Sequence, residues 1–348
     1  HAQFEWGGGM EHQTMSFMGS FGHELMAHEL AHQWFGNYIT CGSWKEIWLN
    51  EGFAVYLTGL TLEHMFMGQY WHRWKESVVN HVTSRKGGSV MVDDTTDVMR
   101  IFDYRLTYNK AGYVLHMLRK QIGDKAFFAG INNYLRDEEL INHYAHTEDL
   151  RKHFETAADT SLQEFFQDWI YGEGYPVYTL EWSQNEEGML AVTVDQEASV
   201  ENAGFFAMHI QMRASGADKD TILRFHHTQK KQTFKARPGF QVQAVNFNPE
   251  LSILTKGTYT SRIEEKSGRQ NLQIIPNPSR NKIRLDYPDS LMPRAVRIFN
   301  TSGKLVYQQA VNHERQGLKV DVNSLKGGSY IVELKTRGYV LKQIFVKI

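Results

Sequence analysis

The chain has 348 residues, of which 41% are hydrophobic and 22% charged, a balance typical of a folded protein with room for two or three domains. Its formal net charge is -1 and its basic residues are scattered, so nothing indicates binding to nucleic acid or to an anionic membrane surface. Cys41 is the only cysteine, which excludes an intrachain disulfide. No apolar stretch approaches the roughly 20 residues of a transmembrane helix.

The first half of the chain has the periodicity of helices. Apolar residues recur at intervals of three and four in four segments, residues 24–35, 51–66, 104–122 and 125–135. We therefore predict a mostly helical domain over residues 1–174.

From Pro176 onward the apolar period changes to two, which favours strands such as residues 178–182 and 190–194. We predict a β-sandwich over residues 175–258 and a polar linker over residues 259–273. Short alternating strands with Gly-containing turns then predict a second, Ig-like β-sandwich over residues 274–348. The expected fold is thus multidomain α+β, with a mostly helical domain followed by two β-sandwich domains.

The predicted helix at residues 24–35 contains the sequence H-E-L-A-H, which places His28 and His32 four positions apart on one face. Two imidazoles in that arrangement can share a metal ion. Glu29 is rotated by about 100° from His28, so it can act on a water at the metal without binding the metal. The chain has 16 histidines, so a chance occurrence of this motif is the alternative.

A third ligand is offered by Glu51, nineteen positions after His32, in the sequence W-L-N-E-G-F-A. A catalytic zinc commonly has three protein ligands and one open position. A carboxylate among large apolar residues is costly unless it is paired or binds a metal. The alternative is a solvated Glu at the start of a helix.

These motifs resemble the gluzincin aminopeptidases of the aminopeptidase N type, which have a thermolysin-like peptidase domain. Four segments carry the resemblance in the family's order, residues 8–14, 28–36, 48–54 and 108–118. The resemblance implies a zinc ion held by His28, His32 and Glu51, with Glu29 as the general base.

The same resemblance implies roles for the other two motifs. Tyr108 would stabilise the oxyanion of the tetrahedral intermediate, and Glu11 would bind the free α-amine of a peptide. The backbone around Gly8 and Gly9 would line the peptide. A carboxylate that holds an ammonium group makes a peptidase act from the amino end.

The sequence departs from the family pattern in two places. His12 replaces the family's Asn after the amine-binding Glu, and Ala111 precedes Gly112 where the family has Gly before Ala. Tyr104 and Tyr113 are the alternatives to Tyr108. In the family a large β domain precedes this region, so we expect the catalytic domain to be truncated at its N-terminal side.

The last 75 residues resemble the C-terminal sorting domain of the type IX secretion route of Gram-negative bacteria. The matching segments are residues 276–278, 298–306, 325–332 and 345–347. The resemblance implies the secretion machinery as a partner and a secreted or outer-surface location. A carbohydrate-binding or adhesive sandwich is the alternative.

The favoured function is therefore hydrolysis of N-terminal residues from peptides by a zinc-activated water. The alternatives are a zinc hydrolase of other specificity (endopeptidase or epoxide hydrolase) and a catalytically weak, surface-exported binding protein. A thiol protease based on Cys41 is disfavoured, because nothing around this residue has a recognisable family context.

Overall fold

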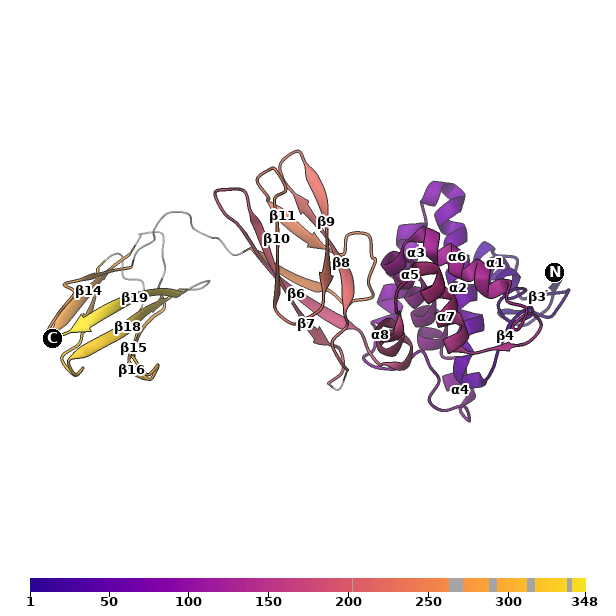
Figure 1. The fold of residues 1–348 in the computed structure, drawn as a ribbon, viewed down its shortest axis with the longest axis horizontal. Helices are drawn as coiled ribbons and strands as arrows, with labels where there is room; N and C mark the ends of the chain where they lie inside the picture. The colour runs from indigo at the N-terminus through magenta and orange to yellow at the C-terminus, as the bar shows by residue number, and fades with distance from the viewer. Residues whose placement is uncertain (202, 263–271, 288–292, 312–316, 337–339) are drawn as a thin grey trace. The chain divides into compact units, whose positions relative to one another are not determined.

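The computed structural model describes residues 1–201, 203–262, 272–287, 293–311, 317–336 and 340–348. The chain divides into two compact units, His1–Arg262 and Ile263–Ile348, each with its own hydrophobic core. The first contains helices and sheets, whereas the described part of the second contains strands (Figure 1). Within the described ranges, no helix has both the length and the apolar character needed to cross a bilayer.

The helical region contains α1 (His23–Ala31), η1 (Trp44–Glu46), α2 (Trp48–His64), η2 (Met65–Gly68), α3 (Trp71–Val82), α4 (Val98–Ile101), η3 (Tyr104–Lys110), α5 (Ala111–Ile122), α6 (Asp124–Leu135), α7 (Thr147–Ala158), α8 (Gln163–Phe166) and η4 (Gln167–Tyr171). The elements η3 and η4 are π-helical, and η3 runs directly into α5. The predicted helix at residues 24–35 stops earlier, at Ala31, and the chain then turns through Gly36, whose φ is +138°.

Two short sheets flank α1 and α2. The first has the order β1-β3-β2, with β1 (Ala2–Gln3), β2 (Gly9–Met10) and β3 (Phe17–Met18). The second pairs β4 (Thr40–Cys41) with β5 (Tyr144–Ala145) in parallel. Strands this short have few ladder hydrogen bonds, so packing against the helices must hold them.

The first sandwich consists of two sheets. One has the order β10-β7-β6-β12, made of β6 (Pro176–Gln184), β7 (Leu190–Ala198), β10 (Gln232–Ala236) and β12 (Thr258–Arg262). The other has the order β11-β8-β9, made of β8 (Met208–Ser215), β9 (Asp220–His227) and β11 (Ala244–Phe247). Alternate residues of β6 and β8, such as Leu180 and Ile210, are buried in one common core.

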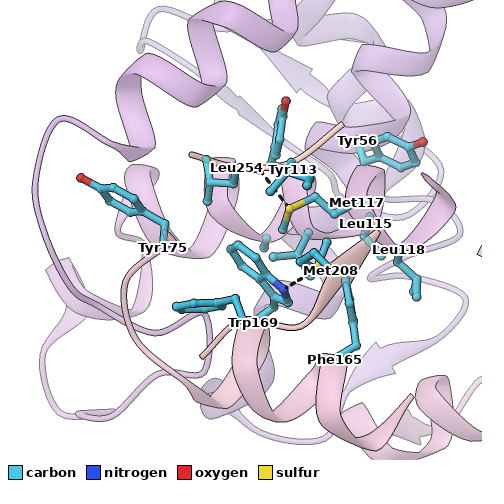
Figure 2. Packing of buried hydrophobic residues seen from close by; sticks show 14 of the residues in the cluster. Tyr56, Tyr113, Leu115, Met117, Leu118, Phe165, Trp169, Tyr175, Met208 and Leu254 are labelled. Atoms are coloured by element: carbon cyan, nitrogen blue, oxygen red, sulfur yellow. Dashed lines mark hydrogen bonds between the residues drawn. The ribbon is translucent and has the colours of Figure 1, made fainter. Parts of the chain in front are cut away.

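The helices and this sandwich bury one continuous core (Figure 2). Trp169 of η4 donates from Nε1 to the sulfur of Met208 in β8, at 3.2 Å. The hydroxyl of Tyr113 in α5 donates to the carbonyl of Leu251. Contacts of this kind join residues 1–174 and the first sandwich into one compact unit.

The second unit also has two sheets. They have the orders β13-β14-β17 and β16-β15-β18-β19, made of β13 (Gln273–Ile275), β14 (Lys282–Asp286), β15 (Ala295–Asn300), β16 (Leu305–Ala310), β17 (Leu318–Asp321), β18 (Gly328–Lys335) and β19 (Val340–Lys347). Buried apolar residues from both sheets, among them Leu285 and Val332, form its core.

The linker prediction for residues 259–273 needs correction at both ends. Residues Thr258–Arg262 form β12, which pairs in parallel with β6, and Gln273 begins β13. The sequence did not predict β12, because its residues include Thr, Ser and Arg and do not show the alternation of apolar residues that is typical of a strand. The central part of the predicted linker, residues 263–271, lies outside the described residues.

Candidate active site

His28 lies on α1, His32 is the C-cap residue directly after this helix, and α2 brings Glu51 against both. Their Nε2 atoms are 3.1 Å apart, and each lies 3.3 Å from Oε2 of Glu51. The Nδ1 atom of His32 is hydrogen-bonded to the carbonyl oxygen of Phe35 at 3.0 Å. This bond fixes the ring so that its other nitrogen points to Glu51.

The spacing of these three atoms suits a metal ion. Metal–ligand bonds of about 2.0–2.1 Å in a tetrahedron put neighbouring ligand atoms roughly 3.3 Å apart. The buried Oε2 of Glu51 forms no hydrogen bond of good geometry among the described residues, although both imidazole nitrogens approach it at 3.3 Å. Two imidazole nitrogens and one carboxylate oxygen thus surround a point that a cation fits.

The electrostatics of the triad agree with cation binding. Burial alone would raise the pKa of Glu51, but the imidazoles of His28 and His32 outweigh that effect and hold it well below its usual value. The carboxylate of Glu51 is therefore ionised at neutral pH and available as a ligand.

Glu29 is the neighbouring carboxylate on α1, and only 4% of its surface is exposed. Burial raises the pKa of Glu29, while the imidazoles of His28 and His32 partly oppose the shift. A raised pKa makes a carboxylate a stronger base toward water. A Cβ placed on Gly9 would lie 2.2 Å from Oε1 of Glu29, so the backbone of Gly9 lies directly against this carboxylate.

Tyr108 is carried on the π-helix η3, and its ring stacks at 6.1 Å between ring centres on His28. Burial and the negative charge of Glu51 raise the pKa of Tyr108, so its hydroxyl remains a hydrogen-bond donor. Tyr104 also lines the cleft but is 62% exposed. Tyr113 is fully buried, and its hydroxyl is used by Leu251. Of the three tyrosines, Tyr108 therefore has the position that best suits the expected oxyanion role.

Glu11 follows β2 and faces α1. Its carboxylate, that of Glu29 and a ring nitrogen of His32 offer atoms within 4.8 Å of one another. Gly8 and Gly9 line the same cleft, which has a volume of about 1030 Å³. The structure thus brings together in one cleft all the residues that the motifs singled out.

The cleft also has walls that the sequence did not indicate. Trp44, Phe102 and Tyr144 line it, and they come from η1, the end of α4 and β5. No motif or periodicity connects these residues, so only the tertiary fold could identify them. Cys41 lies nearby, and burial raises the pKa of its thiol to about 11, which disfavours a thiolate nucleophile.

Residues 13–169 match the peptidase family M1 domain, and residues 273–347 match a secretion system C-terminal sorting domain. The chain is 33% identical over 163 residues to the probable aminopeptidase 1 of Saccharolobus solfataricus, covering 44% of this chain and 20% of that protein. It is 28% identical over 254 residues to aminopeptidase M1-C of Oryza sativa subsp. japonica, covering 69% of this chain and 28% of that protein. The chain therefore spans less than a third of either relative.

The fold is similar to that in the crystal structure of Legionella pneumophila aminopeptidase A in complex with aspartic acid. The TM-score is 0.54 at 16% sequence identity, over 68% of this chain and 26% of that one. The M1 match confirms the resemblance inferred from the motifs, although it begins just after Glu11, and the structural likeness agrees with it in fold. The chain thus carries a peptidase family M1 domain at residues 13–169 and a secretion system C-terminal sorting domain at residues 273–347.

Proposed function

We propose that this protein is a zinc-dependent aminopeptidase that removes N-terminal residues from peptides. His28, His32 and Glu51 hold the zinc ion. The observation that carries the proposal is the convergence of their three ligand atoms within 3.3 Å of one another, with an oxygen of Glu51 that forms no hydrogen bond of good geometry. Two neutral nitrogens and one carboxylate oxygen are a common ligand set of catalytic zinc.

Zinc at this position would supply Lewis acidity that polarises the scissile carbonyl and lowers the pKa of a water molecule. Glu29 accepts the proton of the attacking water and passes it to the amine that leaves. Its burial raises its pKa, which suits a group that first takes a proton and then gives it up.

Tyr108 donates its hydroxyl proton in a hydrogen bond to the oxyanion that forms on the scissile carbonyl. The stacked contact with His28 places the ring beside the triad. A donor of this kind that acts mainly in the transition state contributes about 3 kcal/mol.

Glu11 binds the free α-ammonium group of the substrate. With a divalent ion in place, the carboxylates of Glu11, Glu29 and Glu51 leave the centre with a net charge of about -1. No Lys or Arg lines the cleft in the described part of the chain, so this excess charge is not neutralised by a fixed cation. Glu24 also lines the cleft and adds a further negative charge, so an ammonium group at Glu11 offsets part of the excess, which supports an exopeptidase over an endopeptidase.

The proposal is tested by comparing hydrolysis of a free peptide with hydrolysis of its N-acetylated form. The zinc-loaded protein should strongly prefer the free peptide, and Glu11→Gln should remove the preference without removing zinc. Glu24→Gln is the matched control, because Glu24 lines the same cleft but is exposed on the first turn of α1. Equal cleavage of both peptides by the wild-type protein would indicate an endopeptidase.

Glu29→Gln separates catalysis from binding. The amide has the shape of the carboxylate but cannot accept the proton, so zinc content should persist while turnover falls by about 10²–10⁴. Unchanged turnover would remove Glu29 from the mechanism. Hydrolysis of neither peptide by a zinc-loaded wild-type chain would favour a surface-exported binding protein.

The sorting domain suggests where the enzyme acts. Residues 273–347 match a domain that serves a secretion system, and the motifs point to the type IX route. We expect the domain to engage that machinery, and the enzyme to be secreted or displayed on the outer surface of a Gram-negative cell.

A further inference from the structure

We propose that Asn37 and Gln33 are positioning residues that fix the amine-binding Glu11 at a set distance from the metal ligands. The inference rests on the proposed aminopeptidase function. It concerns main-chain geometry, because both side chains contact the carbonyl group of Glu11 and leave its carboxylate free.

Two amides converge on one oxygen atom. Nδ2 of Asn37 donates to the carbonyl oxygen of Glu11 at 2.6 Å, and Nε2 of Gln33 donates to the same oxygen at 3.3 Å. A carbonyl oxygen has two lone pairs, so it can accept both bonds. Gln33 also approaches the carbonyl oxygen of Glu29 at 3.5 Å, so its amide lies between the strand and α1.

Asn37 is itself held against the metal site. Its backbone N–H donates to the carbonyl oxygen of His32 at 2.9 Å. The intervening turn is closed by Gly36, whose N–H donates to Ile39 at 2.9 Å and whose carbonyl accepts the hydroxyl of Thr40 at 2.6 Å. The side chain of Asn37 therefore starts from a backbone position that is fixed relative to His32.

The strand that precedes Glu11 has little support of its own. Strand β2 contains two residues, which pair with the two residues of β3. Gly9 packs directly on Glu29, and a Cβ at this position would overlap its carboxylate. Besides this packing contact and the pairing with β3, the side-chain amides of Asn37 and Gln33 provide the described polar contacts that tie Glu11 to the end of α1 and the turn after it.

The consequence is a fixed spacing between the group that holds the α-amine and the group that holds the metal ion. Peptide hydrolysis requires the scissile carbonyl to lie in near-attack geometry while the amine is bound. We infer that the link from His32 through Asn37 to Glu11 fixes the distance between the amine-binding carboxylate and the metal ligands. This distance would match one residue of the substrate, as the release of single N-terminal residues requires.

The test measures KM and kcat for free peptides on zinc-loaded Asn37→Ala and Asn37→Asp variants. Aspartate keeps the size of the side chain but lacks the amide donor. One lost hydrogen bond predicts a roughly 2- to 10-fold rise in KM, with zinc content unchanged. Asn132→Ala, an exposed Asn on α6, is the control for the substitution itself and should behave as the wild type.

A double-mutant cycle separates positioning from general destabilisation. If Asn37 acts through Glu11, adding Asn37→Ala to Glu11→Gln should cause little further loss. Full, multiplicative loss in the double variant would contradict the proposal.

Hydrogen exchange over residues 8–18 provides a readout that does not depend on activity. Loss of the clamp should speed exchange in this segment in Asn37→Ala and in Asn37→Asp, but not in Asn132→Ala. Unchanged exchange in both Asn37 variants would overturn the proposal even in an inactive protein. Failure of the aminopeptidase function itself would instead appear as equal cleavage of free and acetylated peptides by the wild type.

Discussion

Replacement of Gly52 by Ala should impair catalysis by separating the helices that carry Glu51 and Tyr108. Gly52 follows Glu51 on α2, and a Cβ there would lie 2.7 Å from the Cβ of Ala111 and 3.3 Å from its carbonyl carbon. Ala111 is the first residue of α5, directly after the π-helix that carries Tyr108. The overlap thus acts between two parts of the active site.

The expected losses of stability and of catalytic rate follow from the steric overlap between the new methyl group and Ala111. Carbon atoms in contact prefer about 3.5–4.0 Å, so α2 and α5 must part by roughly 1 Å. Overpacking costs about 1–3 kcal/mol of folding free energy, and the better helix propensity of Ala returns about 1 kcal/mol. The net loss of stability is therefore about 0–2 kcal/mol. A displacement of about 1 Å between catalytic groups lowers the rate by about 100-fold.

The assay combines kcat for a free peptide, zinc content and urea unfolding. We expect a folded Gly52→Ala protein with a large loss of kcat. Adding Ala111→Gly should restore most of the activity, because it removes the atom that the new methyl group meets. Gly204→Ala is the control, since nothing lies within 4 Å of a Cβ at that position. Wild-type kcat in Gly52→Ala, or no rescue by Ala111→Gly, would show that contact between residues 52 and 111 does not set the geometry of the site.

Three further predictions concern other parts of the molecule. Tyr108→Phe should lower kcat by about 10²–10³ with little change in KM, whereas Tyr104→Phe should change little; the reverse result would assign the oxyanion role to Tyr104. Burial lowers the pKa of Lys110, which donates to Gly88 at 2.8 Å, to about 7. The unfolded chain retains this proton up to about pH 10.4, so the free energy of unfolding of the wild type should rise relative to that of Lys110→Met from pH 7 to 10. Urea unfolding should show a rise of at most about 1.4 kcal/mol per pH unit. A difference between the two proteins that does not depend on pH would contradict this prediction. A chain ending at Arg262 should retain zinc and hydrolysis, because each unit has its own core, but it should fail to reach the cell surface. Activity assays and cell fractionation measure the two results. Normal delivery to the surface would indicate that the last domain is a binding module.

The two histidines of the proposed metal site could be predicted because helix geometry relates them, whereas Glu51 was indicated by its surroundings and by the family resemblance. The spacing of His28 and His32 fixes their shared face, and the apolar surroundings of Glu51 indicate a buried carboxylate that needs a partner. The structure brings the three together, as the spacing suggested. Local periodicity is sufficient for contacts within one helix.

The rest of the site depends on features that periodicity does not record. The apolar pattern of residues 24–35 predicts one helix, yet hydrogen bonds of the turn after Ala31 end it and place Asn37 beside Glu11. The π-helix at Tyr108 is likewise invisible in the pattern, because one extra residue per turn barely changes apolar spacing over seven residues. Strand β12 was missed because its composition is polar.

In the proposed enzyme, one zinc ion and one substrate amine share the cleft at a fixed spacing. A crystal structure of the zinc-soaked protein with a free amino acid, recorded at the zinc absorption edge, tests it most directly. We expect one strong anomalous peak bounded by His28, His32 and Glu51, with the amine of the ligand bonded to Glu11. A peak elsewhere, or an amine bound away from Glu11 beside a correctly placed zinc ion, would contradict it.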